Sequence, residues 1–128
     1  MKWPDWLPVY GDTKYRDKKC PTEDAEQITF FNQIGKIEPC AIHVKNEGKR
    51  HYKQAAKDKA NGLVKGAPDI WIPGKQTFLC ELKRQDHTLC KLGDDQIEFL
   101  ANARDGGAFV CVALGYKAAI EAYNEWKR

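Results

Sequence analysis

The stretch from Gly66 to Lys83 constrains the fold of this chain more than any other segment. Ile70–Ile72 and Thr77–Cys80 are rich in β-branched and aromatic residues, which favour strands. Pro73-Gly74 lies between them and is a turn signal. The sequence therefore predicts two short strands joined as a β-hairpin.

The length of the loop decides which side chains of this hairpin share a face. Side chains alternate along a strand, so Glu81 and Lys83 lie on one face and Leu82 points to the other. A loop with an odd number of residues, of which Gly74–Gln76 is the simplest, places Asp69 opposite Glu81 at about 5 Å between Cβ atoms. An even loop would send the two carboxylates to opposite faces.

Two carboxylates at this separation repel each other unless a proton or a cation lies between them. Mg²⁺ suits such a pair, because it binds a few carboxylate oxygens, keeps several waters and often completes its shell with phosphate. Lys83 projects from the same face as Glu81. Its ammonium can bind a phosphate or hold an attacking water.

These residues resemble a known nuclease superfamily. Pro68-Asp69, eleven intervening residues and then Glu81-Leu82-Lys83 are similar to the PD-(D/E)xK signature. The resemblance runs from about Thr22 to Tyr123, and three further elements in the family's order narrow it to the stand-alone, phage-type VRR-NUC branch. These elements are Thr22–Gln27 at the start of a helix, the basic loop Asn46–Arg50, and Gln96 in the first turn of a later helix.

The resemblance implies a single α/β domain of the restriction-endonuclease-like type, a mixed β-sheet flanked by helices. It also implies an endonuclease that hydrolyses DNA phosphodiester bonds with Mg²⁺ or Mn²⁺. The branch is associated with branched DNA, such as four-way (Holliday) junctions or flaps. A symmetric junction needs two cuts, so a homodimer is the matching architecture. The alternative is a DNA-binding module that keeps the nuclease fold without the chemistry.

The resemblance also assigns roles to individual residues. It implies that Asp69, Glu81, Lys83 and Gln96 form the catalytic set. The metal ligands would be Asp69, Glu81, the backbone carbonyl of Leu82 and a glutamate of the first helix. Glu23 and Glu26 are three residues apart and share a helix face, so either could reach the metal. The family's spacing favours Glu23, and local physics leaves both open.

Basic residues before the hairpin are candidates for contacts with a DNA backbone. Lys49 and Arg50 stand beside a glycine in the predicted loop. Lys53 and Lys57 lie on a predicted basic helix that leads toward the hairpin, and Lys65 precedes Asp69 by four residues. The net charge of +3 is compatible with nucleic acid but does not by itself predict it.

A length of 128 residues fits one domain. Residues 1–20 hold four large aromatic rings without a helical or strand period, so we expect an irregular arm that docks on its own domain, with a subunit contact as the second choice. Residues 21–128 would form the nuclease-like domain. No apolar run is long enough to span a bilayer and no signal peptide is evident, which predicts a cytoplasmic protein without membrane contact.

Five cysteines at wide spacings suggest neither a disulfide framework nor a zinc site, and we expect Cys40 to lie buried in a strand. Residues 84–93 lack periodicity and predict a flexible segment beside the site. The remaining expected elements are helices at 22–33, 52–60, 96–104 and 116–126, and strands at 40–44 and 108–114.

Overall fold

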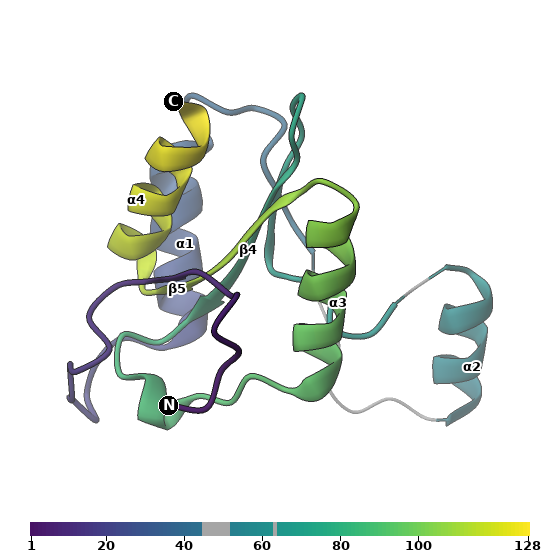
Figure 1. Ribbon diagram of the computed structural model, residues 1–128, viewed down its shortest axis with the longest axis horizontal. Coiled ribbons are helices and arrows are strands. Elements are labelled where there is room, and N and C mark those ends of the chain that lie inside the picture. The colour runs from purple at the N-terminus through teal and green to yellow at the C-terminus, as the bar shows by residue number, and fades with distance from the viewer. Residues whose placement is uncertain (45–51, 63) are drawn as a thin grey trace.

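The computed structural model describes residues 1–44, 52–62 and 64–128. Within them a mixed five-stranded sheet runs in the order β1-β5-β4-β3-β2 (Figure 1). The strands are β1 (Val9–Tyr10), β2 (Ile42–His43), β3 (Ile70–Ile72), β4 (Phe78–Lys83) and β5 (Phe109–Leu114). The helices are α1 (Glu23–Ile34), α2 (Tyr52–Ala60), α3 (Asp94–Asp105) and α4 (Tyr116–Lys127), and a 3₁₀ turn, η1, spans His87–Leu89.

The predicted α/β architecture and the hairpin at its centre are confirmed. Strands β3 and β4 pair antiparallel, with Ile70 opposite Cys80 and Ile72 opposite Phe78, which is the register of the odd loop. Strand β5 pairs parallel to β4 on one side and to β1 on the other, so it is central in the sheet, as its apolar sequence predicts.

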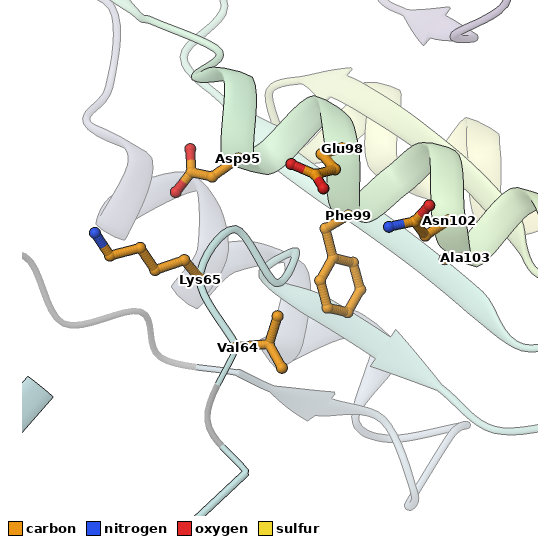
Figure 2. Close-up of a pocket in the computed structure, with 7 residues that line it drawn as sticks. All are labelled: Val64, Lys65, Asp95, Glu98, Phe99, Asn102 and Ala103. Atoms are coloured by element: carbon orange, nitrogen blue, oxygen red, sulfur yellow. The ribbon is translucent and has the colours of Figure 1, made fainter. Parts of the chain in front are cut away.

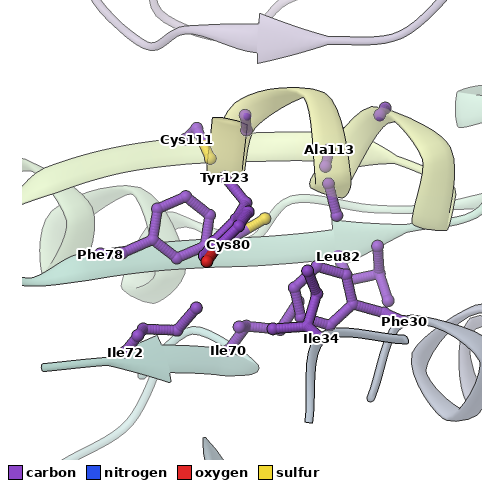
Figure 3. Close-up of a cluster of buried hydrophobic side chains, with 13 residues drawn as sticks. Phe30, Ile34, Ile70, Ile72, Phe78, Cys80, Leu82, Cys111, Ala113 and Tyr123 are labelled. Carbon is purple, nitrogen blue, oxygen red and sulfur yellow. The ribbon is translucent and has the colours of Figure 1, made fainter. Parts of the chain in front are cut away.

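Two layers of helices cover the sheet. Helices α1 and α4 lie on one face and α3 on the other, while α2 stands apart from the sheet (Figure 1). Alternation along β4 sends Phe78, Cys80 and Leu82 into the larger core cluster beneath α1 and α4 (Figure 3). Leu79 packs into the smaller cluster beneath α3. Glu81 and Lys83 therefore belong to the α3 face, near the end of β4.

The N-terminal arm differs from the prediction in one respect. It docks on its own domain as expected, because Leu7 is buried in the α3-side cluster with Trp3 and Trp6 beside it. It also supplies β1, an edge strand in which Val9 pairs with Val112 of β5. The arm is therefore not wholly irregular, and two of its residues extend the sheet.

Two other expectations were wrong. The predicted strand at 40–44 is reduced to β2, and Cys40 is exposed outside it. The segment predicted to be flexible is fixed by hydrogen bonds: the buried Asp86 carboxylate accepts the backbone N–H groups of Asp17 and Thr88, each at 3.0 Å. Polar side chains without a period can still be structured when their partners lie far away in sequence.

Candidate active site

Asp69 and Glu81 lie side by side at the end of the hairpin, as the register predicts. Asp69 precedes β3, and its Oδ2 accepts the backbone N–H of Leu82 at 2.9 Å. On the other side of Asp69, its backbone carbonyl accepts the N–H of Val44 at 2.9 Å. Leu82 of β4 thus holds the Asp69 carboxylate, and Val44, directly after β2, holds its backbone at the start of β3.

Glu81 is a carboxylate in an environment that disfavours its charge. Its side chain is 3% exposed, and Oε2 has no hydrogen-bond partner among the described residues. Burial, and after it the adjoining Asp69 carboxyl, raises the pKa of Glu81 well above its ordinary value. Such an arrangement favours either a proton or a cation between the two side chains.

Lys83 lies on the same face as Glu81 and is 5% exposed. Its Nζ donates a hydrogen bond to the carbonyl oxygen of Lys91 at 2.8 Å. The same nitrogen lies 4.0 Å from Glu81 Oε1 and 3.7 Å from Glu23 Oε1. Lys83 therefore links the carboxylate of β4 to the first turn of α1.

The two glutamates of α1 differ in burial and in their partners. Glu23 is 47% exposed and faces Lys83. Partial burial raises the pKa of the Glu23 carboxyl, and the Lys83 ammonium counteracts part of that shift. Glu26 is buried, and its Oε2 accepts a hydrogen bond from Gln85 Nε2 at 3.0 Å. Glu23 is thus the glutamate directed toward the predicted catalytic residues.

A surface hollow of about 450 Å³, the Lys83 hollow, lies beside this cluster. Lys83 borders it between the first turn of α1 and the segment that follows β4. Its lining residues are Thr22, Glu23, Asp24, Lys83, Arg84, Leu89, Cys90 and Lys91.

The carboxylates do not form a complete metal cage. Among the described residues, no three His, Cys, Asp or Glu side chains converge closely enough to hold an ion by themselves. The pair Asp69 and Glu81, with an unpartnered buried oxygen, still fits Mg²⁺ or Mn²⁺, because Mg²⁺ takes few protein oxygens and completes its shell with water and phosphate.

Two other predicted site residues have structural contacts of their own. The Leu82 side chain is buried in the larger core cluster, while its backbone lies next to Asp69. Gln96 is in the first turn of α3, where its Oε1 accepts the N–H of Gly93 at 2.8 Å and caps the helix. In this conformation the Gln96 side chain stabilises the first turn of α3.

The predicted DNA contacts are only partly described. Lys49 and Arg50 lie outside the described residues, as does the side chain of Lys53. Lys57 is exposed on α2, and Lys65 is exposed at the edge of a groove of about 490 Å³ on α3 (Figure 2). In this α3 groove Val64 and Phe99 point toward one another, and Lys65 is accompanied by acidic residues of the helix. The remaining lining residues are Asp95, Glu98, Asn102 and Ala103.

Sequence reasoning missed three participants around Lys83. The Lys91 carbonyl accepts the Lys83 hydrogen bond, and Arg84 and Gln85 bind the start of α1. A backbone carbonyl leaves no sequence signal. Arg84 and Gln85 directly follow the motif, and this adjacency was the available signal.

The comparisons with known proteins bear on the fold of the chain. No protein-family model and no curated protein sequence matches the chain. One solved structure, described as a VRR_NUC domain protein, superposes with a TM-score of 0.70 over 84% of this chain and 89% of that chain. The chain has the fold of a VRR_NUC domain protein. At 21% sequence identity the likeness shows the fold alone.

No helix in the described ranges of this VRR_NUC-like chain is both long enough and apolar enough to cross a membrane.

Proposed function

We propose that this chain is a metal-dependent endonuclease that hydrolyses DNA phosphodiester bonds. The observation that carries the proposal is the pairing of Asp69 with a buried Glu81 whose Oε2 has no partner among the described residues. A binding module has no need of this pair, which destabilises the fold unless a proton or a cation occupies the site.

Asp69, Glu81 and the Leu82 carbonyl are the groups that would hold Mg²⁺ or Mn²⁺ directly. Glu23, which does not converge with the two carboxylates in this structure, would join them through a metal-bound water. A divalent ion bound there supplies a Lewis acid that stabilises charge on the phosphoryl oxygens. Glu23 is exposed and lines the Lys83 hollow, so water and phosphate can reach the Glu23 side of the cluster. Its contact with Lys83 supports Glu23 over Glu26 as the helix ligand.

Lys83 has the position expected of a group that acts on the reacting phosphate. Hydrolysis forms a bond between a water oxygen and phosphorus and breaks the bond between phosphorus and a sugar oxygen. The Lys83 ammonium is fixed by the Lys91 carbonyl and lines the Lys83 hollow, so it can orient the water or stabilise negative charge as that bond forms.

The exposed basic residues Lys57 of α2 and Lys65 are the described candidates for contacts with the DNA backbone. Lys49, Arg50 and Lys53 stay candidates from the sequence. We further propose branched DNA as the preferred substrate and a homodimer as the active form, because two coordinated cuts resolve a symmetric junction. These two points extend the resemblance to the VRR-NUC branch.

The test is cleavage of labelled four-way junctions, flaps and plain duplex in Mg²⁺ or Mn²⁺, with the mass of the protein in solution measured in parallel. We expect cleavage by the wild type and none by Asp69→Ala, whose DNA affinity should be unchanged or higher because a negative charge is removed. DNA binding without cleavage by the wild type would favour the inactive binding module. Full activity of Asp69→Ala would contradict the site.

A further inference from the structure

Residues 84–87, which directly follow Lys83, are hydrogen-bonded to the N-terminal arm and to the chain that leads into α1. Arg84 Nε donates to the Pro21 carbonyl at 3.1 Å, and Nη2 donates to the Cys20 carbonyl at 2.6 Å and to the Lys18 carbonyl at 3.5 Å. Three carbonyl contacts from one guanidinium hold a backbone in a defined path, since the planar donor group has a fixed geometry.

The residues after Arg84 make further hydrogen bonds, one to α1 and one to the N-terminal arm. Gln85 donates to Glu26 Oε2 at 3.0 Å, one turn further into α1. The His87 Nε2 lies 3.0 Å from the Thr13 carbonyl oxygen in the arm. Segment 84–87 is therefore hydrogen-bonded to residues between Thr13 and Glu26.

Tight packing at Gly115 reinforces the same junction. Gly115 has a φ of +93°, and its N–H donates to the Lys83 carbonyl at 2.9 Å. A Cβ at this position would lie 2.7 Å from Glu26 Oε2 and 2.8 Å from Gln85 Cγ. The Gln85–Glu26 pair thus packs against Gly115, whose N–H binds the Lys83 carbonyl.

The contacts converge on the pair formed by Glu23 and Lys83. Arg84 adjoins Lys83 in the chain, and Pro21, which it holds, precedes Glu23 by two residues. Thr22 between them is extended and caps α1, with its Oγ1 accepting the N–H of Ala25 at 3.2 Å. The guanidinium thereby fixes the start of the helix at the point where Glu23 reaches Lys83.

We propose that Arg84 is a positioning residue: through the Cys20 and Pro21 carbonyls it holds the Glu23 carboxylate beside Lys83. This inference rests on the proposed function only where it assigns Glu23 to the metal. The spatial claim, that Arg84 holds Glu23 beside Lys83, does not depend on metal binding and can be measured without metal. Arg84 would act through the backbone that leads into α1, because its guanidinium donates to the carbonyls of Lys18, Cys20 and Pro21.

The spatial claim is tested by zero-length carbodiimide cross-linking, which joins a carboxylate to an adjacent amine with loss of water. The 3.7 Å contact predicts a Glu23–Lys83 cross-link in the wild type, detected by mass spectrometry of tryptic peptides. We expect Arg84→Gln to lose most of it. Arg16→Gln is the matched control, because Arg16 also donates to backbone carbonyls, those of Thr13 and Tyr15, but only within the arm.

The functional claim is tested by calorimetric Mn²⁺ binding and by the Mn²⁺ concentration for half-maximal cleavage. We expect Arg84→Gln to raise both the dissociation constant and that concentration by about tenfold, as removal of a supporting group around a metal ligand typically does. Glu23→Gln should raise them similarly, and the double variant should be no worse than Glu23→Gln alone, because both changes remove one interaction. Arg84→Lys should recover part of the loss.

Each outcome separates the two proposals. A wild type that neither binds Mn²⁺ nor cleaves DNA contradicts the proposed function, while the cross-link still decides the role of Arg84. An unchanged cross-link in Arg84→Gln overturns the positioning role, and so does an additive double variant. A variant that loses only DNA affinity would make Arg84 a phosphate contact instead. If Arg84→Gln does not fold, Arg84→Lys is compared with Arg16→Lys in the same measurements.

Discussion

At the scale of single residues, Glu81 is the group most poorly suited to its surroundings when no cation is bound. A buried carboxylate with an unpartnered oxygen beside a second carboxylate loses hydration without full compensation. Apart from Lys83, its neighbours in β4 and β5 are apolar and buried, among them Leu82 and Val112. The ionised carboxylate therefore costs stability at this position.

This cost predicts how Glu81→Gln changes the free energy of unfolding without added metal. The raised pKa means that the folded state binds a proton more tightly than the unfolded state. The stability associated with that proton is complete below the ordinary glutamate pKa and is lost as pH rises through the raised value. At neutral pH the amide should therefore stabilise the fold, by about 1–3 kcal/mol.

Urea unfolding in EDTA across pH 4 to 9 measures this effect. The gain from Glu81→Gln should grow with pH, while the exposed control Glu121→Gln should stay near zero at every pH. A variant that is less stable than the wild type at neutral pH would contradict the assignment of Glu81 as a strained carboxylate.

The two glutamates of α1 give a second prediction at this scale. Glu23→Gln should raise the Mn²⁺ concentration for half-maximal cleavage, because Glu23 faces Lys83 at the open side of the site. Glu26→Gln should leave it nearly unchanged, whereas Glu26→Ala should lower stability by about 1–3 kcal/mol by leaving Gln85 without its partner. Metal titration and urea unfolding of the three variants check both halves. The reverse pattern would assign the metal to Glu26.

At the scale of elements, the hairpin could be predicted because its signals are local. Alternation with a period of two and a turn at Pro73-Gly74 indicate the hairpin without knowledge of the rest of the chain. The sequence left open whether the loop is odd or even, and the observed register is the odd one, which places Asp69 opposite Glu81. The neighbour on the other side of β4 is not specified in this way. The pairing of β4 with β5 joins residues about thirty positions apart, and only the apolar run of β5 indicated it.

The elements that were missed depend on long-range contacts. Strand β1 has only two residues and gains its hydrogen bonds from β5, more than a hundred residues later. The segment after Lys83 is polar and aperiodic, but Arg84 and His87 bind carbonyls of the N-terminal arm. Single-sequence patterns carry no information on such partners. The same limit explains why local physics alone does not separate Glu23 from Glu26.

Residues 64–69, the loop that leads to Asp69, contact the start of α3 at Gly66, and this contact predicts the effect of a substitution there. Gly66 has a φ of +83°, and a Cβ there would lie 2.2 Å from the Asp95 carbonyl oxygen. Gly66→Ala should therefore displace the loop from the start of α3 and move Asp69. Gly62 has a φ of +93°, and a Cβ there would have no neighbour within 4 Å among the described residues, so Gly62→Ala carries the backbone strain alone.

Thermal unfolding and cleavage of the two alanine variants separate contact from strain. We expect Gly62→Ala to lose about 1 kcal/mol and to keep its activity. Gly66→Ala should lose at least about 2 kcal/mol more and most of its activity. Equal losses in the two variants would mean that the loop does not depend on close packing against α3.

At the scale of the whole molecule, the N-terminal arm completes both the sheet and the smaller core. Strand β1 covers the edge of β5, which would otherwise present unpaired backbone groups to solvent. Leu7 is 4% exposed in the cluster beneath α3, and Arg104 of α3 lies over the Trp6 ring at 5.5 Å. The arm therefore contacts the sheet, α3 and the segment that follows Lys83, which makes it an integral part of the domain.

Leu7→Ala tests whether the arm unfolds together with the rest of the molecule. Loss of a buried leucine side chain should lower the free energy of unfolding by about 2–5 kcal/mol, provided that the arm and the domain form one cooperative unit. The exposed Val64→Ala should change it by less than about 0.5 kcal/mol. Urea unfolding followed by tryptophan fluorescence and by circular dichroism measures both. Coincident transitions with a shifted midpoint support one unit. A change confined to fluorescence, with the circular dichroism midpoint unmoved, would mean that the arm detaches first and that the larger core beneath α1 and α4 carries the stability alone.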